Sequence, residues 1–302
     1  MTALPVWAHE LVVAPGAFGL AFLHARRALG TARAALELSV LAVYGFCLEL
    51  AAIRSFSSHE YGTAWGLAPF GVPVAVAVVW AAVISSAMAI APRLGWRSAL
   101  GRGATAALVA IVLDLAMEPV AVRAGLWTWT PPGPWLGIPI GNFVGWAVVV
   151  GAYTTSVEIW PDQETDLRTS AMRRLALAAV SIAMLLAVGA VWTGWRAERL
   201  FAGPRGWMVW ATVVSAGALA GLPALARSRA GRSATPSRRD DGIGLASRLA
   251  VPPATLPAGT FLLLAGAFTT DAALLQRADV GVVVLASLGV LAGLGRIASA
   301  SP

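Results

Sequence analysis

Apolar segments about as long as a lipid bilayer is thick recur along this chain, and they constrain its fold more than any other feature. A helix of about 20 residues crosses the hydrocarbon core of a membrane. Segments of roughly this length cover residues 8–25, 34–53, 70–91, 103–122, 140–160, 173–193, 206–226, 256–276 and 278–298. We therefore predict an all-α, polytopic bundle of transmembrane helices that forms one integral membrane domain over residues 1–302.

Two places in the sequence leave the number of spans at eight or nine. Pro15 and two glycines interrupt the first apolar segment. A very short turn joins the last two segments, so one of them is compatible with a re-entrant segment. The composition supports the membrane class in either case, because 12% of the residues are charged whereas soluble domains carry about 25%.

The arginines predict which way the spans run, because cytoplasmic loops of membrane proteins carry an excess of positive charge. With the N-terminus outside and the C-terminus in the cytoplasm, 16 of the 22 arginines fall on the cytoplasmic side. Six of them lie in residues 227–255, which we interpret as a flexible basic cytoplasmic loop. No basic region precedes the first apolar segment, so we expect no cleavable signal peptide and a multi-pass protein of the cell (inner) membrane.

The charge and the cysteine and histidine content narrow the partners of the chain. Its net charge of +7 comes from arginine alone, since the chain has no lysine. In a membrane protein this charge reflects topology and anionic lipid headgroups, so we expect a lipid bilayer and no nucleic acid as partner. One cysteine, Cys47, and three scattered histidines at positions 9, 24 and 59 predict no disulfide and no metal site.

Two carboxylates within the fourth apolar segment are the most informative polar residues. Asp114 and Glu118 are four residues apart, so they share one face of a helix, one turn from each other. Ionisable residues inside a membrane are rare and are functional candidates by default. Asp114 paired with an arginine, merely to hold helices together, is the structural alternative.

Other acidic residues take their depth from the predicted orientation of the spans. Glu49 and Asp271 lie about one turn from the outer ends of their spans, as Glu118 does. Glu49 is also compatible with an ordinary helix-end carboxylate near water. Glu37 and Glu158 lie near the inner boundary, where we expect snorkelling or helix capping.

The outer loops bring aromatic and polar residues to the same level as these acids. The stretch "SFSSHEYGTAW" contains His59, Glu60, Tyr61 and Trp65, and "GLWTWTPPGPWLGIP" contains three tryptophans between prolines. The candidate substrate-binding residues are Tyr61, Trp65, Trp127, Trp129, Trp135, Asn142, Phe143 and Trp146. The simpler readings are interfacial anchors for the tryptophans, a helix cap for Asn142 and an ordinary loop histidine for His59.

An acid in such surroundings suits one kind of chemistry. Desolvation disfavours the ionised form of a carboxylic acid, and two adjacent anions resist forming together, so one of the pair stays protonated near neutral pH. Aromatic faces attract a cation, and tryptophan does so best. These features predict protonation of a carbon–carbon double bond to a tertiary carbocation, in a lipophilic polyene or isoprenoid that lives in the bilayer.

The residue string "DLAMEPVAVRAGLWTWTPPGPWLGIPIGNFVGW" also carries a resemblance. An Asp followed by a Pro, then W-x-W, G-[IV]-P and N-F-x-G-W occur in order at Asp114, Pro119, Trp127 to Trp129, Gly137 to Pro139 and Asn142 to Trp146. A tyrosine-containing loop followed by G-V-P, at Gly71 to Pro73, precedes them. Over roughly residues 44 to 160 the chain resembles the CruF-type membrane family of carotenoid 1,2-hydratases, which includes the bisanhydrobacterioruberin hydratases.

The resemblance implies cofactor-independent addition of water across the terminal C1=C2 double bond of an acyclic carotenoid end, which gives a tertiary hydroxyl. In this hypothesis Asp114 is the proton donor, and Glu118 keeps the proton on it or relays protons. Glu49 and either His59 or Glu60 position water, and Asn142 hydrogen-bonds the acid or the water. The tryptophans flank the cation, and other enzymes of the carotenoid pathway are conceivable partners.

Three other functions stay open at this stage. A membrane cyclase would use the same acid and let an internal double bond capture the cation. An intramembrane prenyltransferase needs two carboxylate clusters for magnesium and diphosphate, and the sequence offers no second one. A proton-coupled transporter predicts inverted repeats, whereas the acids here crowd the first half of the chain.

Overall fold

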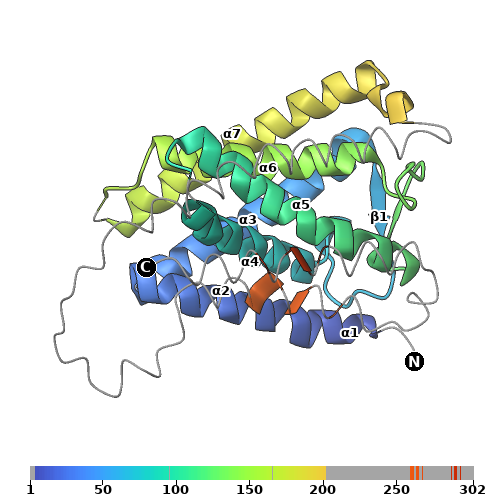
Figure 1. Cartoon of the computed structure of the whole chain (residues 1–302). Coiled ribbons are helices and arrows are strands. Elements are labelled where there is room, and N and C mark those ends of the chain that lie inside the picture. Colours follow the sequence, from blue (N-terminus) through green and yellow to red (C-terminus); the bar gives the residue numbers. More distant parts are fainter. Residues whose placement is uncertain are drawn as a thin grey trace.

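The fold is a bundle of long apolar helices that lie side by side (Figure 1). The computed structural model describes residues 4–94, 96–164 and 166–201, together with a few short pieces between residues 259 and 293. Within these residues six helical segments are long and apolar enough to cross a membrane: Val6–Leu29, Thr31–Phe56, Val74–Leu94, Ala99–Arg123, Ile140–Ile159 and Leu167–Gly194.

These six segments confirm the first six predicted spans as helices. The first comprises α1 (Val6–Ala8), a π-helical stretch (His9–Val13) and α2 (Ala14–Leu29), so Pro15 does not break it. The others are α3 (Thr31–Phe56), α4 (Val74–Ile90) with a 3-10 turn (Ala91–Leu94), α5 (Ala99–Arg123), α6 (Ile140–Ile159) and α7 (Leu167–Gly194). The last three predicted spans, the loop 227–255 and Asp271 fall largely or wholly outside the described residues.

Local sequence signals account for where several helices begin and end. Gly30, with a φ of 80°, separates α2 from α3 in a conformation that costs glycine little. Ser98 caps α5 by accepting a hydrogen bond from the Gly101 amide, and Asp166 caps α7 by accepting one from the Thr169 amide.

The core of the bundle lies between α3, α4, α5 and α6. α5 packs along α6, α3 packs along α4, and α7 covers α3 and α6. Gly45 of α3 permits the closest approach to α4, because a Cβ atom there would lie 2.5 Å from Cβ of Trp80. Gly45 lies one helical turn before Glu49 on α3, so this contact also holds Trp80 of α4 beside Glu49.

Two outer segments that we expected to be loops form a short pair of strands instead. β1 (His59–Tyr61) and β2 (Trp127–Trp129) are antiparallel, and His59 pairs with Trp129 while Tyr61 pairs with Trp127. The strand pair lies at one end of the bundle (Figure 1). It joins the α3–α4 connection to the α5–α6 connection, which positions both over the same helix ends.

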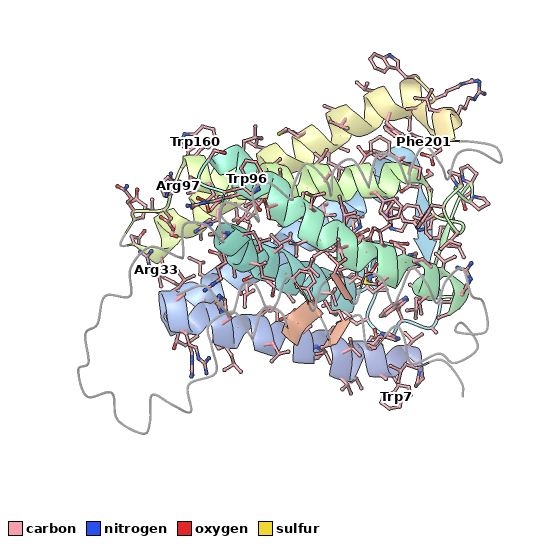
Figure 2. The ribbon with its side chains drawn as sticks, viewed as in Figure 1. Trp7, Arg33, Trp96, Arg97, Trp160 and Phe201 are labelled. Carbon is pink, nitrogen blue, oxygen red and sulfur yellow. The ribbon has the colours of Figure 1, made fainter. Side chains whose placement is uncertain are left out.

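The opposite end of the bundle carries basic residues and ion pairs. Figure 2 shows Arg33, Trp96, Arg97 and Trp160 at that end, and Trp7 and Phe201 at the end with the strands. Arg102 of α5 pairs with Glu158 of α6 at 2.7 Å, and Arg174 of α7 pairs with Glu37 of α3 at 3.2 Å. Glu37 and Glu158 therefore form interhelical ion pairs with an arginine of the adjacent helix, and these partners were not part of the expected snorkelling or capping.

Candidate active site

The strand pair turns alternate residues toward the interior of the bundle. Successive side chains of a strand point to opposite faces, and in both strands the first residue is buried and the middle one exposed. His59 and Trp127 are therefore buried, whereas Glu60 and Thr128 face outward. This alternation selects His59 over Glu60 as the residue that faces the acids.

The first of two carboxylate clusters surrounds Glu118. The indole N–H groups of Trp127 and Trp129 both donate to Oε2 of Glu118, each at 2.9 Å. Asp114 lies one turn earlier on α5 and is fully buried. Its Oδ2 accepts a hydrogen bond from the Asn142 side-chain amide at 2.7 Å, and its Oδ1 has no hydrogen-bond partner among the described residues.

The second cluster surrounds Glu49, which is 8% exposed. Trp80 donates its indole N–H to Oε1 of Glu49 at 2.6 Å, and Nε2 of His59 lies 3.1 Å from Oε2. The Tyr61 hydroxyl also donates a hydrogen bond to the Glu49 carboxylate. On its other side, Nδ1 of His59 lies 3.0 Å from Oγ of Ser58, so both ring nitrogens have partners.

The electrostatics of the strand residues follow from these contacts. Burial alone would lower the pKa of the His59 imidazole, but its hydrogen bond to Glu49 and the charges of Glu49 and Glu118 raise that pKa above its usual value. Burial and the Glu49 charge raise the pKa of the Tyr61 hydroxyl well above its usual range. Tyr61 therefore stays protonated and acts as a hydrogen-bond donor.

Both clusters open onto one cavity of about 630 Å³. The polar residues of its wall include Glu49, His59, Glu118 and Asn142. Aromatic side chains make up much of the remainder: Tyr61, Trp65, Trp80, Trp127, Trp129 and Trp146. The rings of Trp80 and Trp146 are stacked with centroids 4.0 Å apart, and both residues line the cavity.

Comparison with known proteins gives this geometry a biological context. A family model described as "Carotenoid biosynthesis protein" matches residues 10–204 of the chain. The chain belongs to this family. No curated protein and no solved structure matches it.

Membership in the carotenoid biosynthesis family gives the chain a role in carotenoid biosynthesis as a membrane protein. The matched region contains the six long helices of the described part almost entirely, both strands and both carboxylate clusters. The resemblance over residues 44 to 160, noted from the sequence motifs, falls within the same region.

The structure brings most of the predicted site residues to the cavity. Asn142 lies in the wall and donates its side-chain amide to Asp114, and it is not the cap of α6, whose N-cap residue is Pro139. Asp114 itself lies behind the wall, whereas Glu118 reaches the cavity. Within the described residues Asp114 pairs with no arginine, which excludes the structural alternative there.

Besides Asp114, three predicted residues lie outside the cavity wall. Glu60 faces outward from β1. Trp135 and Phe143 belong to a smaller apolar cluster around Ile138. Sequence motifs group these residues with the others because they are adjacent along the chain. The alternation of β1 turns Glu60 away, and the helical period of α6 turns Phe143 away.

Two site residues were missed from the sequence. Trp80 donates the shortest hydrogen bond to Glu49, and its place in an apolar run of α4 gave no sign of this contact. Glu198 of the 3-10 turn Ala197–Phe201 lines the cavity and accepts the amides of Ile140 and Gly141, 2.6 and 3.1 Å away. A carboxylate at the start of α6 is favourable, but the sequence separation of 57 residues between Gly141 and Glu198 hides the pairing.

The described part of the chain contains no group of three or more His, Cys, Asp and Glu side chains arranged to hold a metal ion. The described residues of the cavity wall supply carboxylates, an imidazole, the guanidinium groups of Arg196 and Arg199, other hydrogen-bond donors and aromatic faces.

Proposed function

We propose that this protein is a hydratase that adds water across the terminal C1=C2 double bond of an acyclic carotenoid end and yields a tertiary hydroxyl. The observation that carries the proposal is the buried pair Asp114 and Glu118, held by neutral N–H donors beside an aromatic-lined cavity. Family membership supports the pathway, and the cavity chemistry supports the reaction.

The first step is proton transfer from the pair to C2 of the substrate. Two buried carboxyl groups one turn apart cannot both carry a charge without a large cost, so the pair retains a proton. The charge is better placed on Glu118, which accepts two indole N–H groups, and the proton on Asp114, which accepts one amide. Glu118 faces the cavity and delivers the proton, with Asp114 as its source.

The second step is capture of the tertiary cation at C1 by water. Trp80 and Trp146 stack on each other and both line the cavity, so the outer face of the pair stabilises the cation electrostatically. Glu49, His59 and Asn142 line the cavity, where their polar groups offer hydrogen bonds to the attacking water molecule. Addition of water leaves the oxidation level of the substrate unchanged, so the reaction needs no redox cofactor.

The cavity also fits a substrate that is dissolved in the lipid. Its wall is largely aromatic and aliphatic, and it lies within a bundle of helices that are long enough to cross a bilayer. A volume of about 630 Å³ is in the range of sites that enclose a drug-sized molecule. We propose that one end of the polyene enters the cavity while the remainder stays in the cell membrane.

Product analysis tests the proposal. The full chain is expressed in a bacterium that accumulates lycopene, in water labelled with a heavy oxygen isotope, and the pigments are separated and weighed by mass spectrometry. We expect a more polar product that is heavier by one or two molecules of the labelled water. A product of unchanged mass would contradict hydration and assign a cyclase that uses the same acid.

Unaltered lycopene with the protein present in the membrane is the third outcome, and it would contradict lycopene as the substrate. The same measurement with another acyclic carotenoid then decides whether hydration itself fails.

A further inference from the structure

The cavity wall contains two carboxylates, and the donors around them differ in kind. Glu118 is held by two indoles, which neither gain nor lose protons near neutral pH. Glu49 is held by one indole, a tyrosine hydroxyl and the imidazole of His59, which titrates in this range. One cluster is therefore built around a fixed set of donors, and the other contains a group that can take up a proton.

The strand pair holds the two clusters at a fixed separation. Each strand serves one carboxylate: β1 supplies His59 and Tyr61 to Glu49, and β2 supplies Trp127 and Trp129 to Glu118. The register places the two sets opposite each other. The ring centroids of His59 and Trp129 are 4.8 Å apart, so the imidazole lies against the indole whose N–H group donates to Glu118.

We propose that Glu49 and His59 are the base of the reaction, which takes the proton from the attacking water and returns it to Glu118. This inference rests on the proposed hydratase function and adds a second role to it. The Asp114–Glu118 pair starts the reaction, and the Glu49–His59 pair completes it.

The proton balance of the cycle follows from this division. The O–H bond of the acid breaks, and the π electrons of the substrate form a C2–H bond, which leaves a cation at C1 and a carboxylate in the first cluster. A lone pair of water forms the C1–O bond. The resulting oxonium ion loses one proton to Glu49 and His59. That proton passes to the carboxylate of Glu118 and from there to Asp114, which restores the acid.

Without a base, the same cation has another fate. It loses a proton from carbon to the Glu118 carboxylate and becomes an alkene again. In deuterated water this reversal leaves deuterium in the recovered carotenoid, although no water has been added. Deuterium exchange therefore reports the first step alone, and hydration reports both steps.

The test compares exchange and hydration in deuterated water for the purified full-length protein and three isosteric or near-isosteric variants. Glu49→Gln and His59→Gln are expected to lower hydration about a hundredfold, as loss of a general base does, with exchange within a few-fold of the wild-type rate. Glu118→Gln is the control, and it is expected to lower both. Tryptophan fluorescence and gel filtration verify that each variant folds.

The outcomes separate the two proposals. Equal loss of exchange and hydration in Glu49→Gln and His59→Gln would overturn the base and make the cluster a support for the acid. Unchanged hydration in both folded variants would overturn it as well. A wild-type protein that neither exchanges nor hydrates any acyclic carotenoid would instead contradict the hydratase function itself.

Discussion

The two ends of the bundle provide their carboxylates with opposite kinds of partner. At the end with the basic residues, Glu37 and Glu158 each lie against an arginine of a neighbouring helix, and Asp162 lies 4.0 Å from Arg174. At the end with the strands, Asp114 and Glu118 bond only to neutral N–H groups, and Glu49 bonds to two neutral donors and a histidine.

In the proposed function, the acids that pair with arginines join helices, and the acids with neutral or imidazole partners take part in proton transfer. An arginine is always charged, so its carboxylate partner stays ionised and serves to join helices. Neutral donors and an imidazole do not fix the protonation state in this way, so these carboxyl groups remain able to gain and lose protons. We infer that the kind of partner, more than depth in the membrane, marks the acids that react.

Replacing one acid at each end of the bundle with glutamine gives the largest expected difference in hydration rate. Glu118→Gln removes a group that transfers the proton, and we expect hydration to fall by about a hundredfold to ten-thousandfold. Glu158→Gln alters an acid paired with Arg102 and should leave the rate per folded protein within about twofold. Initial rates with detergent-solubilised protein measure both. Equal losses in the two variants would break the comparison.

Removing an arginine should affect stability and leave the chemistry unchanged. Arg174→Met leaves Glu37 buried without its cation, and we expect the free energy of unfolding to fall by about 3 kcal/mol. The Arg102–Glu158 pair is more exposed, with 32% and 25% of the two side chains accessible, so Arg102→Met should cost below about 1 kcal/mol. Thermal denaturation in detergent compares them, and a normal product from Arg174→Met is part of the expectation.

Trp80 tests whether the donors around Glu49 matter to turnover. Trp80→Phe removes the 2.6 Å hydrogen bond to Glu49, and a hydrogen bond to a charged group contributes about 1.5–3 kcal/mol. We expect hydration to slow by about tenfold to a hundredfold. Trp135→Phe is the matched control, because its indole N–H has no partner among the described residues. Similar rates for the two variants would argue against a role for Trp80.

The pH profile probes the titrating member of the second cluster. The Glu49–His59 pair accepts a proton only when His59 is neutral, so activity should fall as pH decreases through the His59 pKa. Since that pKa is raised, the acid limb should lie above the usual histidine value. The titratable groups that face His59 within the described residues are Glu49, Glu118 and Tyr61. His59→Gln should remove the limb, and an unchanged limb would assign it to another group.

The smallest expected effect concerns the aromatic faces. Trp146→Leu removes one face of the stacked pair, and a cation–π contact contributes about 1 kcal/mol, so we expect hydration to slow by about fivefold. Trp160→Leu changes an exposed tryptophan at the opposite end (Figure 2) and should have no effect on the rate. A larger loss for Trp160 than for Trp146 would contradict the assignment of the cavity.

Much of the fold was predictable, because hydropathy depends only on local sequence. All six predicted spans within the described residues are helices, and the intramembrane position of Asp114 and Glu118 follows from the same pattern. The strand pair was not predictable, since each strand has three residues and forms only by pairing with another loop.

The site was predictable in composition but less so in geometry. Residue type and predicted depth identified Glu49, His59, Glu118 and Asn142, all of which line the cavity. Trp80 reaches Glu49 only because α4 packs on α3, and Glu198 reaches the start of α6 only because α7 packs on α6. The sequence contains no sign of this packing. Trp80 and Glu198 therefore emerged only from the structure.

The most direct test of the central claim is the pigment profile of three strains that accumulate lycopene and express wild type, Asp114→Asn or Glu158→Gln at matched levels. We predict that wild type and Glu158→Gln give the same hydroxylated product, heavier by one or two waters, and that Asp114→Asn gives none although it is folded in the membrane. Full hydration by Asp114→Asn would contradict the claim that the acids without a cationic partner perform the chemistry.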